Sequence, residues 1–102
     1  MDFSSLGLNK HLVAAVSSLG YREPTPIQAQ AIPAILNQQD IMAGAQTGTG
    51  KTAAFALPIL HQLSESLPVS NEQEVSHRPI RALVLTPTRE LAQQVHNSFI
   101  DY

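Results

Sequence analysis

The sequence predicts an α/β fold with a parallel sheet and flanking helices. Residues 40–45 and 80–87 are short and apolar, and each is followed by a stretch with helical periodicity. Successive strand-then-helix units of this kind favour a right-handed parallel crossover. A glycine-rich segment also lies at the first strand-to-helix junction, where α/β folds commonly bind phosphate groups.

The size and composition of the chain indicate one small globular domain. It has 102 residues, of which 43% are hydrophobic and 14% are charged, as in folded rather than disordered chains. No apolar run approaches the roughly 20 residues that span a membrane, and the first residues do not resemble a signal peptide. Because cysteine is also absent, we expect a cytoplasmic protein with no membrane partner. The formal net charge of −2 means that nucleic-acid binding would need a local site.

Two helices are expected before the first strand. One runs from Asn9, as its N-cap, to a stop at Gly20, and the other opens at Thr25 with a proline in its first turn. Pro33 removes one backbone hydrogen bond within the second helix, so we expect a kink or a break there. The apolar residues at helical spacing are Leu12, Val13, Val16 and Leu19 in the first helix and Ile27, Ala31, Ile35 and Leu36 in the second.

The rest of the chain alternates strand and helix. Residues 40–45 run quickly into glycine, as a buried parallel strand does before a tight loop, and 51–66 follow as a helix weakened by Pro58. Residues 68–79 are polar and lack either period, which indicates a loop before the second strand, 80–87. A final helix comes next. The expected inner residues are Phe55, Ile59, Leu60 and Leu63 in the first of these helices and Leu91, Val95 and Phe99 in the second.

The strongest local signal is the segment AQTGTGKT, residues 45–52. It follows an expected strand and opens an expected helix, which is the context of a phosphate-binding loop. Gly48 and Gly50 leave the backbone N–H groups accessible to phosphate oxygens. Lys51 would then contact the β- and γ-phosphates, and the Thr52 hydroxyl would ligate Mg²⁺.

This loop leaves the class of protein open. Ala45 stands where the general pattern G-x-x-x-x-G-K-[ST] has glycine, which is acceptable if the backbone there has a negative φ. The structural alternative is a glycine turn followed by Lys-Thr by chance. A true phosphate loop predicts only a nucleoside triphosphate ligand, because kinases, GTPases, transporters and motors all contain one.

Gln28 can be interpreted in two ways. Thr25 to Gln28 is a capping-box pattern, in which Thr25 caps an amide near Gln28 and the Gln28 carbonyl accepts from the Thr25 backbone N–H. A primary amide also offers a donor and an acceptor that match N7 and N6–H of adenine, whereas guanine presents two acceptors there. Gln28 would therefore select ATP over GTP. The two roles would compete for one carbonyl if the cap forms in the empty state.

Three motifs, in this order and at these distances, resemble those of DEAD-box ATP-dependent RNA helicases. GYREPTPIQ (20–28), AQTGTGKT (45–52) and PTRELA (87–92) are similar to the Q motif, motif I and motif Ia of that family. The family's motif I commonly begins with alanine, as Ala45 does, and Phe3 matches the family's isolated upstream aromatic. The resemblance covers nearly the whole chain, and the context PTPIQAQAIPAIL and LVLTPTRELAQQV is most similar to the bacterial RhlE-like group.

The resemblance implies that residues 1–102 form the N-terminal part of the first RecA-like lobe, with the Q motif in the region 1–29. It implies ATP and Mg²⁺ as cofactors and RNA as a partner, and it names no protein partner. The implied ATP-binding residues are Phe3, Tyr21, Gln28, Ala45, Gln46, Thr47, Gly48, Thr49, Gly50, Lys51 and Thr52. Lys51 and Thr52 would act catalytically, Thr52 through its hydroxyl on the metal. The implied RNA-binding residues are Pro87, Thr88 and Arg89.

Each implied role has a structural alternative. Tyr21 would be a boundary aromatic, and Phe3 would pin the N-terminus. Arg89 would belong to a solvated first helical turn, and Thr88 would simply be its N-cap.

Several parts that ATP hydrolysis needs are not found in this sequence. It contains no Asp-Glu-Ala-Asp motif and no second lobe, and none of Asp2, Asp40 and Asp101 follows a buried apolar strand. We therefore expect the 102 residues alone to be inactive and their strands to lack sheet neighbours. The alternatives to a helicase are a non-catalytic nucleotide-binding module or another P-loop NTPase.

Overall fold

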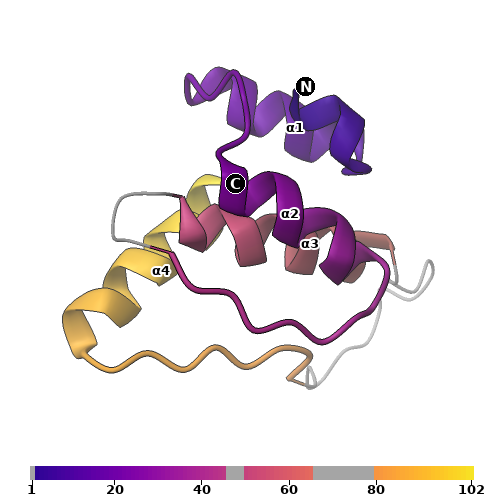
Figure 1. Cartoon of the computed structure of the whole chain (residues 1–102). Coiled ribbons are helices and arrows are strands. Elements are labelled where there is room, and N and C mark those ends of the chain that lie inside the picture. The colour runs from indigo at the N-terminus through magenta and orange to yellow at the C-terminus, as the bar shows by residue number, and fades with distance from the viewer. Residues whose placement is uncertain (1, 46–49, 66–79) are drawn as a thin grey trace, which may run out of the picture.

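The computed structural model describes residues 2–45, 50–65 and 80–102. The elements in these ranges are the 3-10 helix η1 (Phe3–Leu6) and the α-helices α1 (Lys10–Ser18), α2 (Pro26–Leu36), α3 (Lys51–Glu65) and α4 (Arg89–Asp101). Figure 1 shows α2 and α3 side by side at the centre, with α1 above them and α4 below. The other helices therefore lie around α3, whose first turn contains the last two residues of the phosphate-loop sequence.

Helix α1 begins and ends where the sequence predicts. The Asn9 side chain accepts a hydrogen bond from the Leu12 N–H at 3.0 Å, which makes it the N-cap. Gly20 has a φ of 92°, and its N–H donates to the Ser17 carbonyl at 3.0 Å while the Tyr21 N–H donates to Val16 at 2.9 Å. These two bonds form a Schellman motif, which ends the helix and fixes the backbone of Tyr21 just beyond it.

Helix α2 opens at Thr25, as predicted, but it is not broken at Pro33. The helix continues to Leu36, and the Asn37 N–H donates to the Pro33 carbonyl at 3.0 Å. A proline removes one backbone bond, and the tertiary packing of the surrounding turns compensates for that loss. Here that packing comes from buried Ala31 and Ile32, the two residues that directly precede Pro33. Helix α3 likewise runs through Pro58, which is buried.

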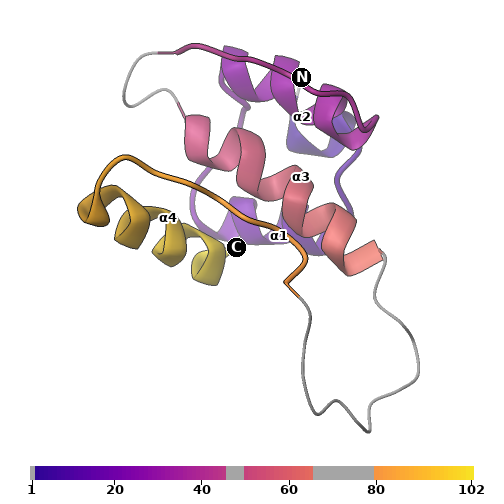
Figure 2. The ribbon, with the colours of Figure 1, turned by 90° about the horizontal axis from the view of Figure 1, so that it is seen from below.

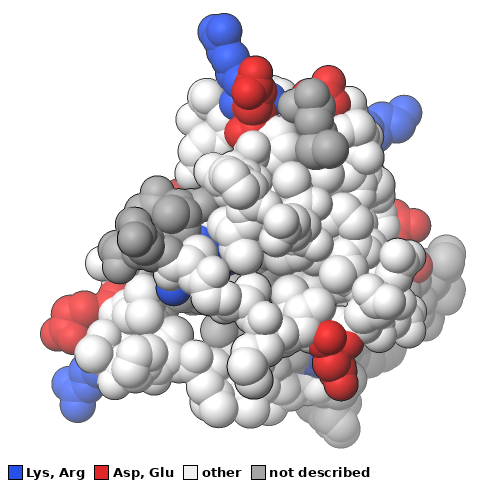
Figure 3. Space-filling model, viewed as in Figure 1, with Lys and Arg blue, Asp and Glu red and all other residues white. Residues whose placement is uncertain are grey.

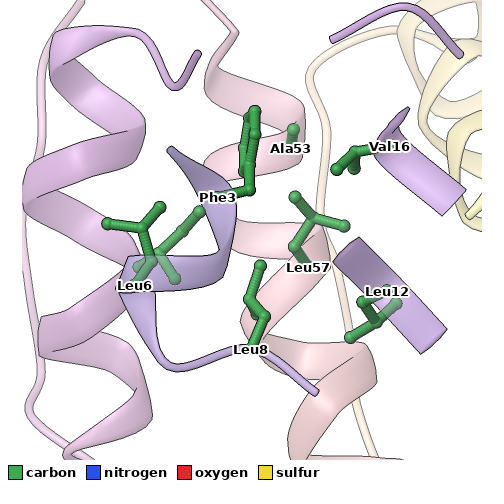
Figure 4. Packing of buried hydrophobic residues seen from close by; sticks show 8 residues of the cluster. Phe3, Leu6, Leu8, Leu12, Val16, Ala53 and Leu57 are labelled. Atoms are coloured by element: carbon green, nitrogen blue, oxygen red, sulfur yellow. The ribbon is translucent and has the colours of Figure 1, made fainter. Parts of the chain in front are cut away.

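The hydrophobic core joins η1, α1, α2 and α3. Figure 4 shows Phe3, Leu6 and Leu8 from the N-terminal segment lying among side chains of α1 and α3. The fully buried Leu57 of α3 and Ile32 of α2 belong to the same cluster. Phe3 is therefore a core residue, as its structural alternative required, and it pins the N-terminus to α3.

The prediction of which α3 side chains face inward is wrong in part. The buried residues of α3 include three alanines, and the large apolar side chains expected to face inward are only half-buried. Leu57 and Pro58 are buried with these alanines, so the buried part of α3 combines small and large side chains. The three buried alanines are Ala53, Ala54 and Ala56, and the half-buried residues are Phe55, Ile59, Leu60 and Leu63.

The two segments expected as strands are not strands in the described part of the chain. Residues 40–45 and 80–86 have no regular secondary structure, although Figures 1 and 2 show both passing along one side of the α2 and α3 pair. Several of their large apolar side chains are exposed, among them Met42 and Leu85. A strand forms only where a neighbouring strand pairs with its backbone, and none does so within the described residues.

A mostly apolar cavity of about 290 Å³ lies where these two segments face the helices. It is lined by Ile41 and Val84 from the segments and by Ile27, Ala31 and Phe55 from α2 and α3. Those apolar side chains are the ones that a sheet would cover. The helical layer is therefore in place, while the sheet is not formed among the described residues.

Charged residues are sparse on the face seen in Figure 1. Figure 3 shows the Lys, Arg, Asp and Glu side chains mostly at the margins of this face, with no broad basic area on its described part. Among the described residues, no group of three or more His, Asp or Glu side chains is arranged to hold a metal ion. No helix in the described ranges has the length and apolar character needed to cross a membrane.

Candidate nucleotide site

The Q-motif segment and the phosphate-loop segment meet at Gln28 and Gly50. The Gln28 Nε2 donates a hydrogen bond to the Gly50 carbonyl at 3.2 Å. Gly50 has a φ of 88°, and a Cβ atom at this position would collide with the Gln28 amide nitrogen and crowd the Thr25 hydroxyl. Only glycine satisfies both the backbone conformation and the close approach.

The predicted capping box is present at the start of α2. The Thr25 Oγ1 accepts from the Gln28 N–H at 3.4 Å, and the Gln28 Oε1 accepts from the Thr25 N–H at 3.0 Å. Gln28 is only 5% exposed and is the buried polar residue of the described core. Its side chain therefore caps the start of α2 and at the same time bonds Gly50 of the phosphate-loop segment.

The capping role of Gln28 does not require competition with a base. A primary amide has two N–H hydrogens and its oxygen has two lone pairs. The cap takes one lone pair and Gly50 takes one hydrogen, so one donor and one acceptor remain. Gln28 also lines the large cavity described next. Its remaining donor and acceptor suffice for a base contact while the cap stays formed. The expected competition for the Gln28 carbonyl therefore does not follow from the cap alone.

A cavity of about 700 Å³ brings most of the described candidate residues together. Its lining contains seven residues that the motifs single out, from η1, the loop before α2, α2 itself and the start of α3: Phe3, Tyr21, Thr25, Gln28, Gly50, Lys51 and Thr52. Lys51 is exposed and Thr52 is half-buried. The N-terminus of α3 opens into this cavity, so its backbone N–H groups favour an anion there.

The middle of the phosphate loop lies outside the described residues. Gln46, Thr47, Gly48 and Thr49 belong to that part. Ala45 is described and half-buried, and it is not among the residues that line the large cavity. The described end of the loop is ordered by Gly50, whose carbonyl accepts from both the Ala54 N–H at 3.1 Å and Gln28.

Comparison with known proteins identifies the family to which a chain with these motifs belongs. A family profile described as "DEAD/DEAH box helicase" matches residues 25–102. The chain belongs to this family.

Its relatives include two bacterial proteins named as RNA helicases. The chain is 46% identical, over its whole length, to the ATP-dependent RNA helicase DeaD of Buchnera aphidicola, and it covers 15% of that protein. It is 48% identical, over 92% of its length, to the DEAD-box ATP-dependent RNA helicase RhpA of Helicobacter pylori, and it covers 17% of that protein. The chain thus spans about one sixth of the length of these relatives.

Solved structures show the same RecA-like DEAD-box fold. The chain matches a DEAD box protein from Methanococcus jannaschii with a TM-score of 0.80 and 39% identity, over 99% of this chain and 25% of that one. It matches the RNA helicase Prp28 from Chaetomium thermophilum, bound to ADP, with a TM-score of 0.84 and 41% identity, over 98% of this chain and 23% of that one. The helical arrangement described above is therefore that of the DEAD-box fold.

Helix α4 of this DEAD-box chain contributes a wall of the large cavity that sequence reasoning missed. The lining residues are Leu91, Gln94, Ser98 and Tyr102, which recur at helical spacing along one face. The sequence pointed to the neighbouring stripe of Leu91, Val95 and Phe99, of which only Val95 is buried. The cavity-lining face was not recognised because its middle is polar.

Tyr102 is the most constrained residue of this wall. It is partly buried against the hydrophobic core, and it lines the large cavity together with Tyr21. Burial, followed by the contact with Tyr21, raises the pKa of the Tyr102 phenol above its ordinary value. The phenol therefore stays protonated near neutral pH and keeps its O–H as a donor.

The first three residues of motif Ia of the DEAD-box family, unlike Leu91, do not line the large cavity. The Thr88 Oγ1 accepts from the Leu91 N–H at 3.1 Å, so Thr88 is the N-cap of α4, and the Thr86 hydroxyl donates to the Thr88 carbonyl at 3.1 Å. Pro87, Thr88 and Arg89 are all exposed and are not among the residues that line the large cavity. They form a separate surface at the start of α4.

Proposed function

We propose that this chain supplies the ATP-binding and RNA-contacting part of the first lobe of an ATP-dependent RNA helicase, an RNA-dependent ATPase that separates short RNA duplexes. The observation that carries the proposal is the bond from Gln28 to Gly50, which joins the Q motif to the phosphate loop at one cavity. Relatives with 46–48% identity are named as ATP-dependent RNA helicases, which supports this assignment.

Adenine would be recognised at Gln28. The free N–H and the free lone pair of its amide match N7 and the N6 amino group of adenine. Phe3 and Tyr21 line the same cavity and offer apolar and aromatic surface for the base. Guanine would place an acceptor opposite the amide oxygen, and so we propose ATP rather than GTP as the substrate.

The triphosphate would lie at the start of α3. Lys51 supplies a positive charge at the cavity, and the helix N-terminus adds backbone N–H groups that favour an anion. The Thr52 hydroxyl, half-buried in the same lining, fits Mg²⁺, which is commonly bound through one or two protein oxygens together with phosphates and water. Bound Mg²⁺ would neutralise charge on the phosphates during hydrolysis.

RNA would be contacted at the start of α4. Exposed Thr88 and Arg89 stand at the first turn of that helix, where backbone N–H groups favour phosphate. Arg89 adds a local charge, which is needed because the chain as a whole is slightly acidic. We assign Pro87 to the same surface.

We also propose that residues 40–45 and 80–86 become strands of a parallel sheet when further strands of the lobe are present. The apolar cavity between them and the helices supports this assignment. Within the family we place the chain in the RhlE-like group, on the contexts PTPIQAQAIPAIL and LVLTPTRELAQQV.

The test is ATP turnover by the intact protein with and without single-stranded RNA. We expect RNA to stimulate hydrolysis, and we expect Lys51→Ala to abolish it because the phosphate contact is lost. The 102-residue chain alone should show no turnover. If the intact protein hydrolyses ATP at the same rate without RNA, the helicase assignment is wrong and another P-loop NTPase activity is indicated. If it binds ATP and never turns it over, the chain belongs to a non-catalytic nucleotide-binding module.

A further inference from the structure

We propose that Gln94 and Ser98 of α4 bind the ribose of the nucleotide and so determine the sugar specificity of the site. This role rests on the nucleotide-binding function proposed above. It concerns the part of the nucleotide between the base and the phosphates, to which none of the three sequence motifs assigns a residue.

Helix α4 lies beside α3 (Figure 2) and forms a wall from the phosphate side of the large cavity to its base side. Near the start of α4, Leu91 lines both this cavity and the apolar cavity of about 290 Å³. Lys51 and Thr52 line the same two cavities, so Leu91 lies on the phosphate side. At the other end, Tyr102 packs against the core cluster that contains Phe3, and both residues line the large cavity. The end of α4 is therefore on the base side.

Gln94 and Ser98 occupy the middle of this wall. A helix rises about 1.5 Å per residue, so Leu91 and Tyr102 are about 16 Å apart along its axis. On the same scale Gln94 lies about 5 Å from Leu91, and Ser98 lies about 6 Å from Tyr102. A nucleotide with its phosphates at the start of α3 and its base at Gln28 would therefore place its sugar opposite Gln94 and Ser98.

The cavity has room for a sugar between its two ends. Its volume of about 700 Å³ falls within the range of roughly 300–1,000 Å³ that is typical of small-molecule sites. Such sites orient their ligands with a few polar groups on a mostly apolar wall. In the wall formed by α4, Gln94 and Ser98 are the polar groups between Leu91 and Tyr102.

The polar atoms of this pair match the hydroxyls of a ribose. The Ser98 hydroxyl donates its hydrogen to the Gln94 backbone carbonyl at 3.2 Å, so its lone pairs remain to accept from a ribose O–H. Within the described ranges the side-chain amide of Gln94 forms no hydrogen bond. It offers N–H donors and a carbonyl acceptor, and each ribose hydroxyl can both donate and accept.

The neighbouring face of α4 carries a similar pair that is arranged differently. The Gln93 Nε2 donates to the Asn97 Oδ1 at 3.2 Å. Both residues are exposed, and neither is among the residues that line the large cavity. The helix therefore has one amide pair closed on itself and one polar pair directed at the cavity.

The experiment compares the binding of ADP, 2′-deoxyADP and 3′-deoxyADP to the intact protein by titration calorimetry; diphosphates avoid ATP turnover during the titration. We expect at least one deoxy form to bind about fivefold more weakly than ADP, the size expected for one hydrogen bond. In the double variant Gln94→Ala/Ser98→Ala, ADP should also bind about fivefold more weakly. The affinity for that deoxy form should stay unchanged, because the hydroxyl and its partners contribute only together.

Gln93→Ala/Asn97→Ala is the matched control, because these residues have the same spacing on the same helix and lie outside the cavity lining. It should leave the affinities for all three nucleotides unchanged. Equal binding of ADP and both deoxy forms by the wild type would overturn the ribose contact. So would a preference for ADP that survives in the Gln94→Ala/Ser98→Ala variant, or an equal loss of affinity for all three nucleotides. A wild-type protein that binds neither ADP nor ATP would instead overturn the proposed function.

Discussion

At the scale of single residues, the hydrogen bond between Gln28 and Gly50 connects the Q motif to the phosphate loop. Gln28 closes the capping box of α2 and donates to the Gly50 carbonyl, and Gly50 accepts this contact because it has no side chain. The glutamine thus has a structural role, and the proposed adenine contact would use its remaining donor and acceptor. A single side chain can serve both roles because an amide forms up to four hydrogen bonds.

Replacing Gly50 by alanine should damage the junction severely. The new Cβ would meet the Gln28 amide and would need a positive φ, so we expect a loss of about 1–3 kcal/mol in the free energy of unfolding of the intact protein. ATP binding should weaken as well. Gly44→Ala is the control, since a Cβ there meets nothing within 4 Å. Urea denaturation measures the difference, and equal effects of the two substitutions would contradict the close approach.

Replacing Gln28 by alanine should affect both stability and nucleotide choice. We expect a loss of about 1–2 kcal/mol of stability, because the cap and a buried hydrogen bond disappear together. ATP affinity, measured by calorimetry, should fall while tripolyphosphate affinity falls much less. Gln30→Ala, at an exposed position of the same helix, should change neither affinity. A loss of stability with unchanged ATP affinity would leave Gln28 as a cap alone.

At the scale of elements, the helix ends are set by local bonds that the sequence contains. Asn9, Thr25 and Thr88 each accept a hydrogen bond from the backbone N–H three residues later. Asn9 does more than cap α1: its Nδ2 donates to Ser64 Oγ at 3.1 Å, and its backbone N–H donates to His61 Nδ1 at 3.1 Å. The N-cap residue of α1 is therefore also hydrogen-bonded to the end of α3.

Asn9→Ala should remove both the cap and the side-chain tie. We expect the free energy of unfolding of the intact protein to fall by about 1–2 kcal/mol, measured by urea denaturation. Asn9→Ser keeps a capping hydroxyl and is too short to reach Ser64, so it should recover most of the loss. If serine is no better than alanine, the tie to α3 contributes more than the cap.

At the scale of the whole molecule, a helical layer is complete and the expected sheet is not formed among the described residues. The helices bury their own core around Leu57 and Ile32, whereas the segments 40–45 and 80–86 leave apolar side chains exposed beside an apolar cavity. Exposed apolar patches of this kind are binding surfaces or aggregation sites. The described residues therefore fold as helices and present two segments that no described strand pairs with.

Amide hydrogen exchange of the 102-residue chain should show this division. We expect the amides of residues 41–44 and 81–86 to exchange rapidly, because no described strand pairs with them, and the buried turns of α2 and α3 to exchange slowly. In the intact protein the same two segments should become protected as a sheet forms. Equal protection of the segments and the helices in the short chain would contradict the structure.

The sequence alone determined the features that depend on near neighbours. The N-caps, the stop of α1 at Gly20 and the capping box could all be predicted, because each involves bonds within a few residues. The family resemblance could be recognised for a related reason, since its motifs are short and ordered. The predicted strands are not shown among the described residues, because a strand depends on a partner that lies elsewhere in the chain.

Only the tertiary structure decided which distant groups meet. It brought Gln28 to Gly50, placed Tyr21 and Tyr102 in the lining of one cavity, and buried three alanines of α3. No local pattern indicates these contacts, because they depend on how helices pack against one another and not on the conformation of any one of them. The sequence thus determined where the helices end and where phosphate would bind, and the packing of those helices decided which residues surround the site.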